Sequence, residues 1–413
     1  MWSSSRRGTA AARRRVGLIG AACAAAAWGP PAHAALEYFV PRVEATAESD
    51  SNIDLDPTRK THAYGYGGLV LADIGVATPR SDTAIRPELN YLRYPDQTGI
   101  SQLDSRLDLR SEFATQRSQF TLYGRFDRED TTYAELSPAI YNTLDPNVRP
   151  NPDTGLVREG VISTMFYLAP SYLYRLTPRL SFATDAYYQR EAYSDTAQST
   201  GLGNFNFYQL NLGLVQRLDE NSSFRYGPYA SRFESGGVAD TNAYGLKLGY
   251  DRKWSRTVSM ELSVNAERDK TTQTLPVPFD GSTTQWGVAV SLVKQGEIST
   301  TRLTVDRVLS PSGAGAKVAT DELRLQYDRH LSERLRVLGA ARYIRDSGVA
   351  TSTLFPVRNY TRADIEAEWL MTPVFFIKAG YEFTWQKFST DTNSAANHSF
   401  SIGIGYQALK RRP

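Results

Sequence analysis

The feature that most constrains this chain is an alternation of apolar and polar residues that continues for about a dozen positions at a time. Segment 102–113 places its apolar side chains on one face and its charged side chains on the other, and segments 362–369 and 375–386 repeat this pattern. A period of two is typical of a β-strand with one apolar face. Such strands are longer than those of most soluble sheets and can cross a bilayer at a tilt. The apolar face of the first segment comprises Leu103, Leu107, Leu109 and Phe113.

The connections between the expected strands alternate between two kinds. Eight are short and tight, and nine are longer, polar and rich in Gly, Pro, Asp and Asn, which gives eighteen strands. The tight turns are expected at Thr78–Ser81, Thr115–Ser118, Thr177–Arg179, Asp219–Ser222, Trp254–Thr257, Lys294–Glu297, Leu331–Arg334 and Met371–Val374. The longer loops are expected at 49–61, 95–99, 129–160, 194–203, 235–240, 269–281, 310–317, 347–357 and 389–396.

An even strand number, with short turns at one end and long loops at the other, is typical of an up-and-down antiparallel barrel in an outer membrane. The sequence therefore predicts an all-β transmembrane barrel of eighteen strands, with sixteen as the alternative count. The short turns would face the periplasm and the long loops the outside. Trp254 and Trp369 fall beside tight turns, and Trp286 and Trp385 fall near the opposite strand ends, as two aromatic girdles require. Eighteen strands at ~4.8 Å spacing and ~40° tilt give a backbone diameter of roughly 35 Å.

The first 34 residues have the composition of a secretory signal. Arginines precede an apolar run from Val16 to Trp28, and Pro30-Pro31-Ala32-His33-Ala34 ends it. We expect cleavage after Ala34, which leaves residues 35–413 as one barrel domain. A twin-arginine signal at Arg13-Arg14 and lipidation of Cys23 are the alternatives, and both fit the flanking residues less well.

Removal of this segment changes the charge and thiol content of the chain. It holds five arginines and the only cysteine, so Lys+Arg falls from 47 to 42 against 44 acidic residues, a net charge of −2. The mature chain has no disulfide and no cysteine-based metal site. A net negative charge also argues against a nucleic-acid-binding protein.

Segment 39–94 resembles the start of the outer-membrane β-barrel porin family (β-barrel porin 2-like) that is often associated with exopolysaccharide production. The similar residues are Phe39-Val40-Pro41-Arg42-Val43, Glu48-Ser49-Asp50-Ser51-Asn52-Ile53 and Arg86-Pro87-Glu88-Leu89-Asn90-Tyr91. The resemblance implies an outer-membrane pore and, more narrowly, the export of a surface polysaccharide together with other export components. The last strand, with Ser401, Gly403, Tyr406 and Ala408, is similar to the C-terminal signal that barrel-assembly machinery recognises.

The polar faces of the strands predict a lumen wall with charges of both signs. These charges would line a wet channel, or they would form a packed ladder of ion pairs that holds the barrel in shape. The candidate channel-lining residues are Asp104, Arg106, Asp108, Arg110, Glu112, Arg125, Asp127, Glu366, Lys378 and Glu382. Arg324, Arg362 and Glu322 belong to the same face.

Loop 129–160 is the longest expected connection and has a net charge of −4. By analogy with general porins it would fold into the lumen as an acidic constriction; the alternative is a solvated surface loop stiffened by prolines. The candidate constriction residues are Glu129, Asp130, Glu135, Asp145, Asp153 and Glu159.

Motifs for catalysis are scarce. Asn397-His398-Ser399 invites comparison with a lipase site, but adjacent strand residues point to opposite faces, so His398 and Ser399 could not share a proton. No metal cluster, cofactor motif or phosphate-binding loop is evident. We therefore expect a non-enzymatic pore for hydrophilic solutes in contact with outer-membrane lipids. A structural docking barrel with a closed lumen is the alternative, and a barrel enzyme the minor one.

Overall fold

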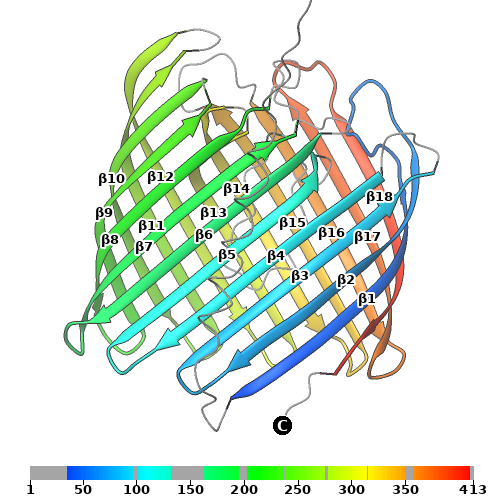
Figure 1. Ribbon diagram of the computed structural model, residues 1–413, viewed down its shortest axis with the longest axis horizontal. Coiled ribbons are helices and arrows are strands. Elements are labelled where there is room, and N and C mark those ends of the chain that lie inside the picture. Colours follow the sequence, from blue (N-terminus) through cyan, green and yellow to red (C-terminus); the bar gives the residue numbers. More distant parts are fainter. Residues whose placement is uncertain are drawn as a thin grey trace, which may run out of the picture.

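Eighteen antiparallel strands pair in chain order, and the pairing of β1 with β18 closes them into a barrel in this computed structural model (Figure 1). The structure describes residues 35–95, 101–131, 154, 161–194, 202–236, 238–274, 278–313, 315–348 and 357–409. The prediction of an eighteen-stranded barrel is thus confirmed. The expected signal segment 1–34 lies outside the described residues. Among the described residues, no helix is both long and apolar enough to cross a membrane.

The strands contain 13 to 17 residues, slightly more than the alternation in the sequence predicted. Their bounds are β1 Leu36–Asp50, β2 Ala63–Ala77, β3 Ser81–Arg93, β4 Ser101–Ala114, β5 Ser118–Asp130, β6 Ile162–Arg175, β7 Leu180–Tyr193, β8 Phe205–Arg217, β9 Ser222–Ser235, β10 Ala239–Lys253, β11 Val258–Gln273, β12 Phe279–Gln295, β13 Ser299–Pro311, β14 Lys317–His330, β15 Leu335–Gly348, β16 Arg358–Leu370, β17 Phe375–Phe388 and β18 Ala395–Gln407.

All eight tight turns and all nine longer connections lie where the sequence predicted them, with small shifts in their limits. The turn expected at Lys294–Glu297 lies between Gln295 and Ser299, because β12 continues two residues further than its polar end indicates. The loop expected at 269–281 is shorter, since β11 and β12 extend into it as a long hairpin. Such differences arise because hydrogen bonding between strands can continue through polar residues that a hydropathy pattern assigns to a loop.

A hydroxyl near the start of the turn closes most of the tight turns. In six of them, the Oγ of a Ser or Thr accepts a hydrogen bond from the backbone N–H three residues later, at 2.9 to 3.1 Å. The six residues are Thr78, Thr115, Thr177, Ser255, Ser332 and Thr372. Ser and Thr satisfy local backbone donors in this way, which favours a turn over continued strand. At Asp219 a carboxylate has this role, and its hydrogen bonds from Ser222 and Asn221 lower its pKa.

The outer wall of the barrel is apolar. Side chains that alternate with the lumen residues are exposed on the outside, including Leu103 at 55%, Ile365 at 54% and Ile402 at 61%. In water such a wall would be costly, whereas acyl chains solvate it and the closed ladder leaves no unpaired strand edge. A closed barrel with an apolar outer wall is the architecture of outer-membrane proteins.

The tryptophans mark the two edges of this wall. Trp254 and Trp369 are exposed beside tight turns, and Trp286 is exposed about ten residues from the turn end of β12. Trp385 lies at the same distance along β17 and is half-buried. Ten residues at ~3.4 Å rise and ~40° tilt give a height of about 25 Å, which matches the apolar band of such barrels.

One glycine is required where two strands approach each other closely. A Cβ added to Gly227 on β9 would lie 1.9 Å from the carbonyl oxygen of Leu212 and 2.6 Å from the Cα of Gly213, so the backbone would have to move. We expect Gly227→Ala to lower the free energy of unfolding by about 2 kcal/mol, a typical cost of overpacking. Gly249→Ala on the neighbouring strand is the control, because its nearest contact is the Cβ of Arg225 at 3.5 Å. Urea titration in phospholipid vesicles measures both, and equal stabilities would contradict the prediction.

Candidate pore lining

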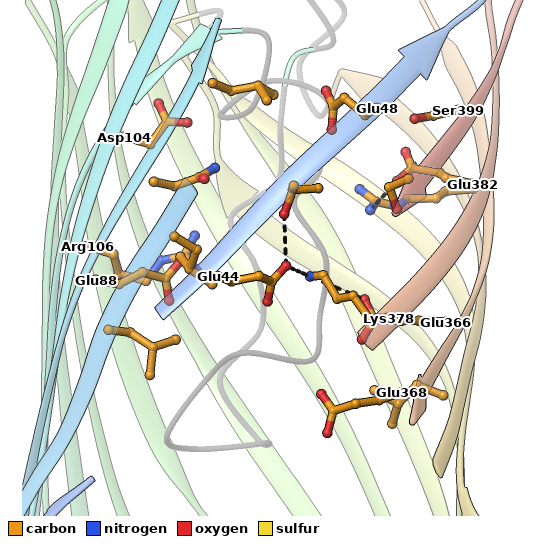
Figure 2. A pocket seen from close by; sticks show the side chains of 18 of the residues that line it. Glu44, Glu48, Glu88, Asp104, Arg106, Glu366, Glu368, Lys378, Glu382 and Ser399 are labelled. Atoms are coloured by element: carbon orange, nitrogen blue, oxygen red, sulfur yellow. Dashed lines mark hydrogen bonds and ion pairs between the residues drawn. The ribbon is translucent and has the colours of Figure 1, made fainter. Parts of the chain in front are cut away.

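A cavity of about 820 Å³ lies inside the barrel, along the sector formed by β1–β5 and β12–β18 (Figure 2). Its walls are side chains on the inward faces of these strands. Eleven of the lining residues are Asp or Glu, and seven are Arg or Lys, so the formal charge of the lining is −4. This excess of carboxylates sets the electrostatic character of the cavity.

At the centre of the cavity, the carboxylate of Glu44 on β1 forms ion pairs with two cations, of which Figure 2 shows Lys378. Lys378 on β17 binds it directly, and the Arg42 guanidinium lies 3.4 Å away. Arg42 also pairs with Glu368 on β16 at 2.9 Å, and Lys378 lies 3.7 Å from Glu366. These pairs connect β16 and β17 to β1 across the seam strand β18, so they stiffen the wall on both sides of the closure.

A second network joins β3, β4 and β5. The Arg106 guanidinium lies 2.7 Å from Glu129, 3.0 Å from Asp127 and 3.7 Å from Glu88. Arg125 also pairs with Asp127, at 2.5 Å. Arg125 also lies 4.0 Å from Asp108, so each of the two cations contacts at least two carboxylates, and these contacts hold the side chains in fixed positions.

A third network lies on β14 and β15 and is almost fully buried. Glu322 accepts hydrogen bonds from Arg324 at 2.6 Å and from Arg342 at 2.7 Å. Arg324 and Arg342 are direct partners across the two strands, and Arg342 faces Arg362 on β16. Like charges in direct register repel each other, so the carboxylate between them is essential to this arrangement.

Three acidic side chains toward the loop end of the cavity have neutral hydrogen-bond partners. Glu48 accepts a hydrogen bond from Tyr94, Asp50 from Asn397 at 3.0 Å, and Asp104 from the backbone N–H of Asp130 at 3.0 Å. None of the three forms an ion pair with a residue that the structure describes. Figure 2 shows Glu48 and Asp104 toward the same end of the cavity. When ionised, these three carboxylates have no cationic partner among the described residues, and they then make this end of the cavity negative.

The wall opposite the charged sector is aromatic. Four inward-facing rings on β5, β6, β7 and β8 form an edge-to-face row, with centroid distances of 5.5, 4.7 and 5.4 Å between neighbours. The rings belong to Tyr123, Tyr167, Tyr187 and Phe207. The sequence analysis did not identify this row, which the strand register assembles.

The connection between β13 and β14 reaches across the loop end of this aromatic sector. The carbonyl of Gly313 accepts a hydrogen bond of 2.7 Å from the N–H of Gly203, and a Cβ added to Gly313 would lie 2.1 Å from the Tyr193 hydroxyl of β7. Ser312 is 1% exposed, and Gly315 lies against Ser235 and Val238 beside β9. The segment therefore covers the sector near β7–β9, whereas the cavity follows the opposite wall.

The predicted channel-lining residues all lie on the inward faces of their strands, as their register with other lumen residues shows. Asp104, Arg106, Glu366, Lys378 and Glu382 line the cavity itself. Asp108, Arg125 and Asp127 belong to the buried wall beside it, and Arg110 pairs with Glu112 at 2.5 Å. Their role in conduction stays a prediction.

Two of the six predicted constriction residues are described, and both belong to β5 instead of a loop. Glu129 points inward to Arg106, and the N–H of Asp130 bonds to Asp104, because the ladder with β6 continues to Ile162. Glu135, Asp145, Asp153 and Glu159 lie outside the described residues.

The structure separates the residues of the lipase-like motif. The His398 ring points outward and lies 2.9 Å from the Tyr381 hydroxyl, whereas Ser399 lines the cavity. The two cannot share a proton, as strand geometry predicted. Among the described residues, no group of three or more potential ligands could hold a metal ion.

Comparisons with known proteins give a likeness of architecture. No protein-family model and no curated protein sequence matches this chain, so the resemblance to the exopolysaccharide-associated porin family is unconfirmed. Among solved structures, the chain is similar to OccK2 (OpdF) of Pseudomonas aeruginosa, with a TM-score of 0.44, 9% identity, and 90% of this chain and 98% of that chain covered. For OprD of the same organism the TM-score is 0.41 and the identity 11%, with 91% of this chain and 96% of that chain covered. For the FrpB iron transporter of Neisseria meningitidis the TM-score is 0.43 and the identity 8%, with 90% of this chain and 81% of that chain covered.

Proposed function

We propose that this protein is an outer-membrane pore that passes small hydrophilic solutes. The observation that supports it best is the cavity of about 820 Å³ inside a closed barrel, lined by charged side chains. A barrel of roughly 35 Å backbone diameter is too wide for its own side chains to fill, so such a lumen holds water or a plug. At ~30 Å³ per water molecule, the cavity has room for about 27 waters or for a small solute.

The ion pairs support this proposal because they keep the lining in place without closing it. Arg42, Lys378 and Arg106 are each held by carboxylates on other strands of the same sector, so their side chains stay against the wall. A wall of fixed and alternating charges lets a polar solute exchange one contact for the next. This is the condition for passage without tight binding.

Single-channel recording in planar bilayers tests the proposal. The folded, purified protein is expected to give discrete conductance steps, and liposomes that contain it should swell in a monosaccharide solution. A correctly folded protein that shows neither conductance nor swelling would support the alternative, a closed barrel that docks other components at the cell surface. Heat-modifiable mobility on a gel serves as the control for folding.

Passage of a surface polysaccharide is a narrower form of the same proposal. It is supported only by the resemblance of segment 39–94, and the insertion of β18 by barrel-assembly machinery is likewise a proposal from the C-terminal pattern. Swelling assays with saccharides of increasing length distinguish the two forms. A cutoff at short oligosaccharides would exclude polymer export while leaving the small-solute pore intact.

A further inference from the structure

The lipid-facing side of the barrel has a regular row of arginines near its loop end. Each occupies the position ten residues after the first residue of its strand, so all lie at one height above the tight turns. All five are exposed, and their neighbours along the strand point into the lumen. The row consists of Arg128 on β5, Arg190 on β7, Arg232 on β9, Arg268 on β11 and Arg345 on β15.

Strand register extends two of these arginines into triplets of the same composition. Arg345 on β15 faces Asn359 on β16, which faces Lys387 on β17. In the same way Arg232 on β9 faces Asn242 on β10, which faces Lys270 on β11. The two cations of each triplet are separated by two strand spacings, about 9.6 Å between backbones. Both long side chains can therefore reach one ligand between them.

The two triplets differ in their neighbours. The Arg232 guanidinium pairs with Glu234 on its own strand at 2.6 Å, which compensates part of its charge. Neither Arg345 nor Lys387 forms an ion pair with a residue that the structure describes. In the triplet Arg345–Asn359–Lys387 both exposed cations face outward, and the acid in register with Arg345, Asp321 on β14, pairs with Arg307 at 2.9 Å.

The position of this triplet indicates the kind of ligand. Tyr343 and Trp385 lie two residues closer to the turns on the same outward face, and the Tyr343 hydroxyl donates a hydrogen bond of 3.0 Å to the Asn359 side chain. Below these rings the wall is apolar, so the cations lie where acyl chains end and head groups begin. A guanidinium and an ammonium, with an amide between them, are the donors that bind phosphate in proteins.

We propose that Arg345, Asn359 and Lys387 bind the phosphate group of a lipid in the leaflet at the loop end of the barrel. The continuity of the triplet with the apolar wall favours a lipid over a soluble protein, because the acyl chains of the same molecule would cover Tyr343 and Trp385. The proposal does not depend on whether the lumen conducts.

Native mass spectrometry with diphosphorylated lipid A as the probe tests this site. Wild-type protein in detergent is expected to retain the lipid, and Arg345→Gln/Lys387→Gln should reduce the bound fraction at least about fivefold, since both charged donors are lost. Arg252→Gln/Arg329→Gln is the matched control, because both residues are exposed, outward-facing bases at the turn end. This control should bind as the wild type does.

Three outcomes would overturn the proposal. The double variant could retain lipid A as the wild type does, the turn-end control could lose as much, or dephosphorylated lipid A could bind equally well. Heat-modifiable gel mobility identifies the folded fraction of each variant. The single variant Arg345→Gln provides a milder change if the double variant folds poorly, and it should show an intermediate loss.

Discussion

Glu322→Gln is expected to lower the free energy of unfolding by about 3 kcal/mol, because it removes the carboxylate that, within the described part of the chain, accepts hydrogen bonds from both Arg324 and Arg342. Glu322 is 7% exposed, and the two arginines are 6% and 4% exposed, so water cannot replace the lost carboxylate. Glutamine keeps the volume and one acceptor but leaves two guanidinium groups in direct register. Asp306 on β13 lies directly across from Glu322 and would still attract the two arginines in the variant. We therefore expect a loss of stability at the lower end of the range observed when one partner of a buried ion pair is removed.

Urea titration in phospholipid vesicles, followed by tryptophan fluorescence, measures this loss. Glu112→Gln is the matched control, since Glu112 also pairs with an arginine, at 2.5 Å, but both side chains are more than a third exposed. An exposed pair contributes at most about 1 kcal/mol, so this variant should be nearly as stable as the wild type. Equal destabilisation of the two variants would show that burial does not control the strength of these pairs.

The second large effect concerns ion selectivity and depends on the proposed pore function. The wild-type channel is expected to prefer potassium over chloride, because the lining has a formal charge of −4 and its loop-end acids lack cationic partners. Neutralising them in Glu48→Gln/Asp50→Asn/Asp104→Asn should lower the permeability ratio by about threefold at 0.1 M salt. At this ionic strength the screening length is about 10 Å, so each charge acts across much of the cavity.

Reversal potentials in a potassium chloride gradient measure the ratio. Glu234→Gln/Asp240→Asn/Asp321→Asn removes the same charge from the outward faces of β9, β10 and β14 and should leave selectivity unchanged. At 1 M salt the difference between wild type and the lumen variant should shrink. A conducting but anion-selective wild type would refute the electrostatic argument without refuting the pore, whereas no conductance would refute the pore itself.

Most of the fold follows from local features of the sequence. The alternation fixes which face of each strand is apolar, and turn residues such as Thr115, Thr177 and Asp219 fix where each hairpin bends. Together these determine the register of neighbouring strands. The lumen position of Asp104 and Lys378 could therefore be predicted, and the row from Tyr123 to Phe207 could have been found by applying the same register.

The contacts between distant segments could not be predicted in this way. Gly313 meets Gly203 and Tyr193 across the mouth of the barrel, and the small residues around Gly313 indicate only a permissive backbone. Similarly, the sequence places Glu44 and Glu322 on the inward face but does not show that Lys378 neutralises the first and two arginines the second. Strand tilt and side-chain reach select these partners, and neither is a property of a single segment.

The seam between β1 and β18 differs from every other pairing in the barrel. All other strands bond to their neighbours in sequence, whereas the seam joins Arg42–Asp50 to residues 399–407, more than 300 positions later. The entropic cost of closing the long loop between β1 and β18 is therefore incurred when this single pairing forms. Until that step, a growing sheet would expose two open edges that hydrocarbon cannot tolerate. Before β1 pairs with β18, both open edges of the sheet must therefore be hydrogen-bonded by a partner protein or by water. The barrel can insert fully into the bilayer core only when this last pairing forms.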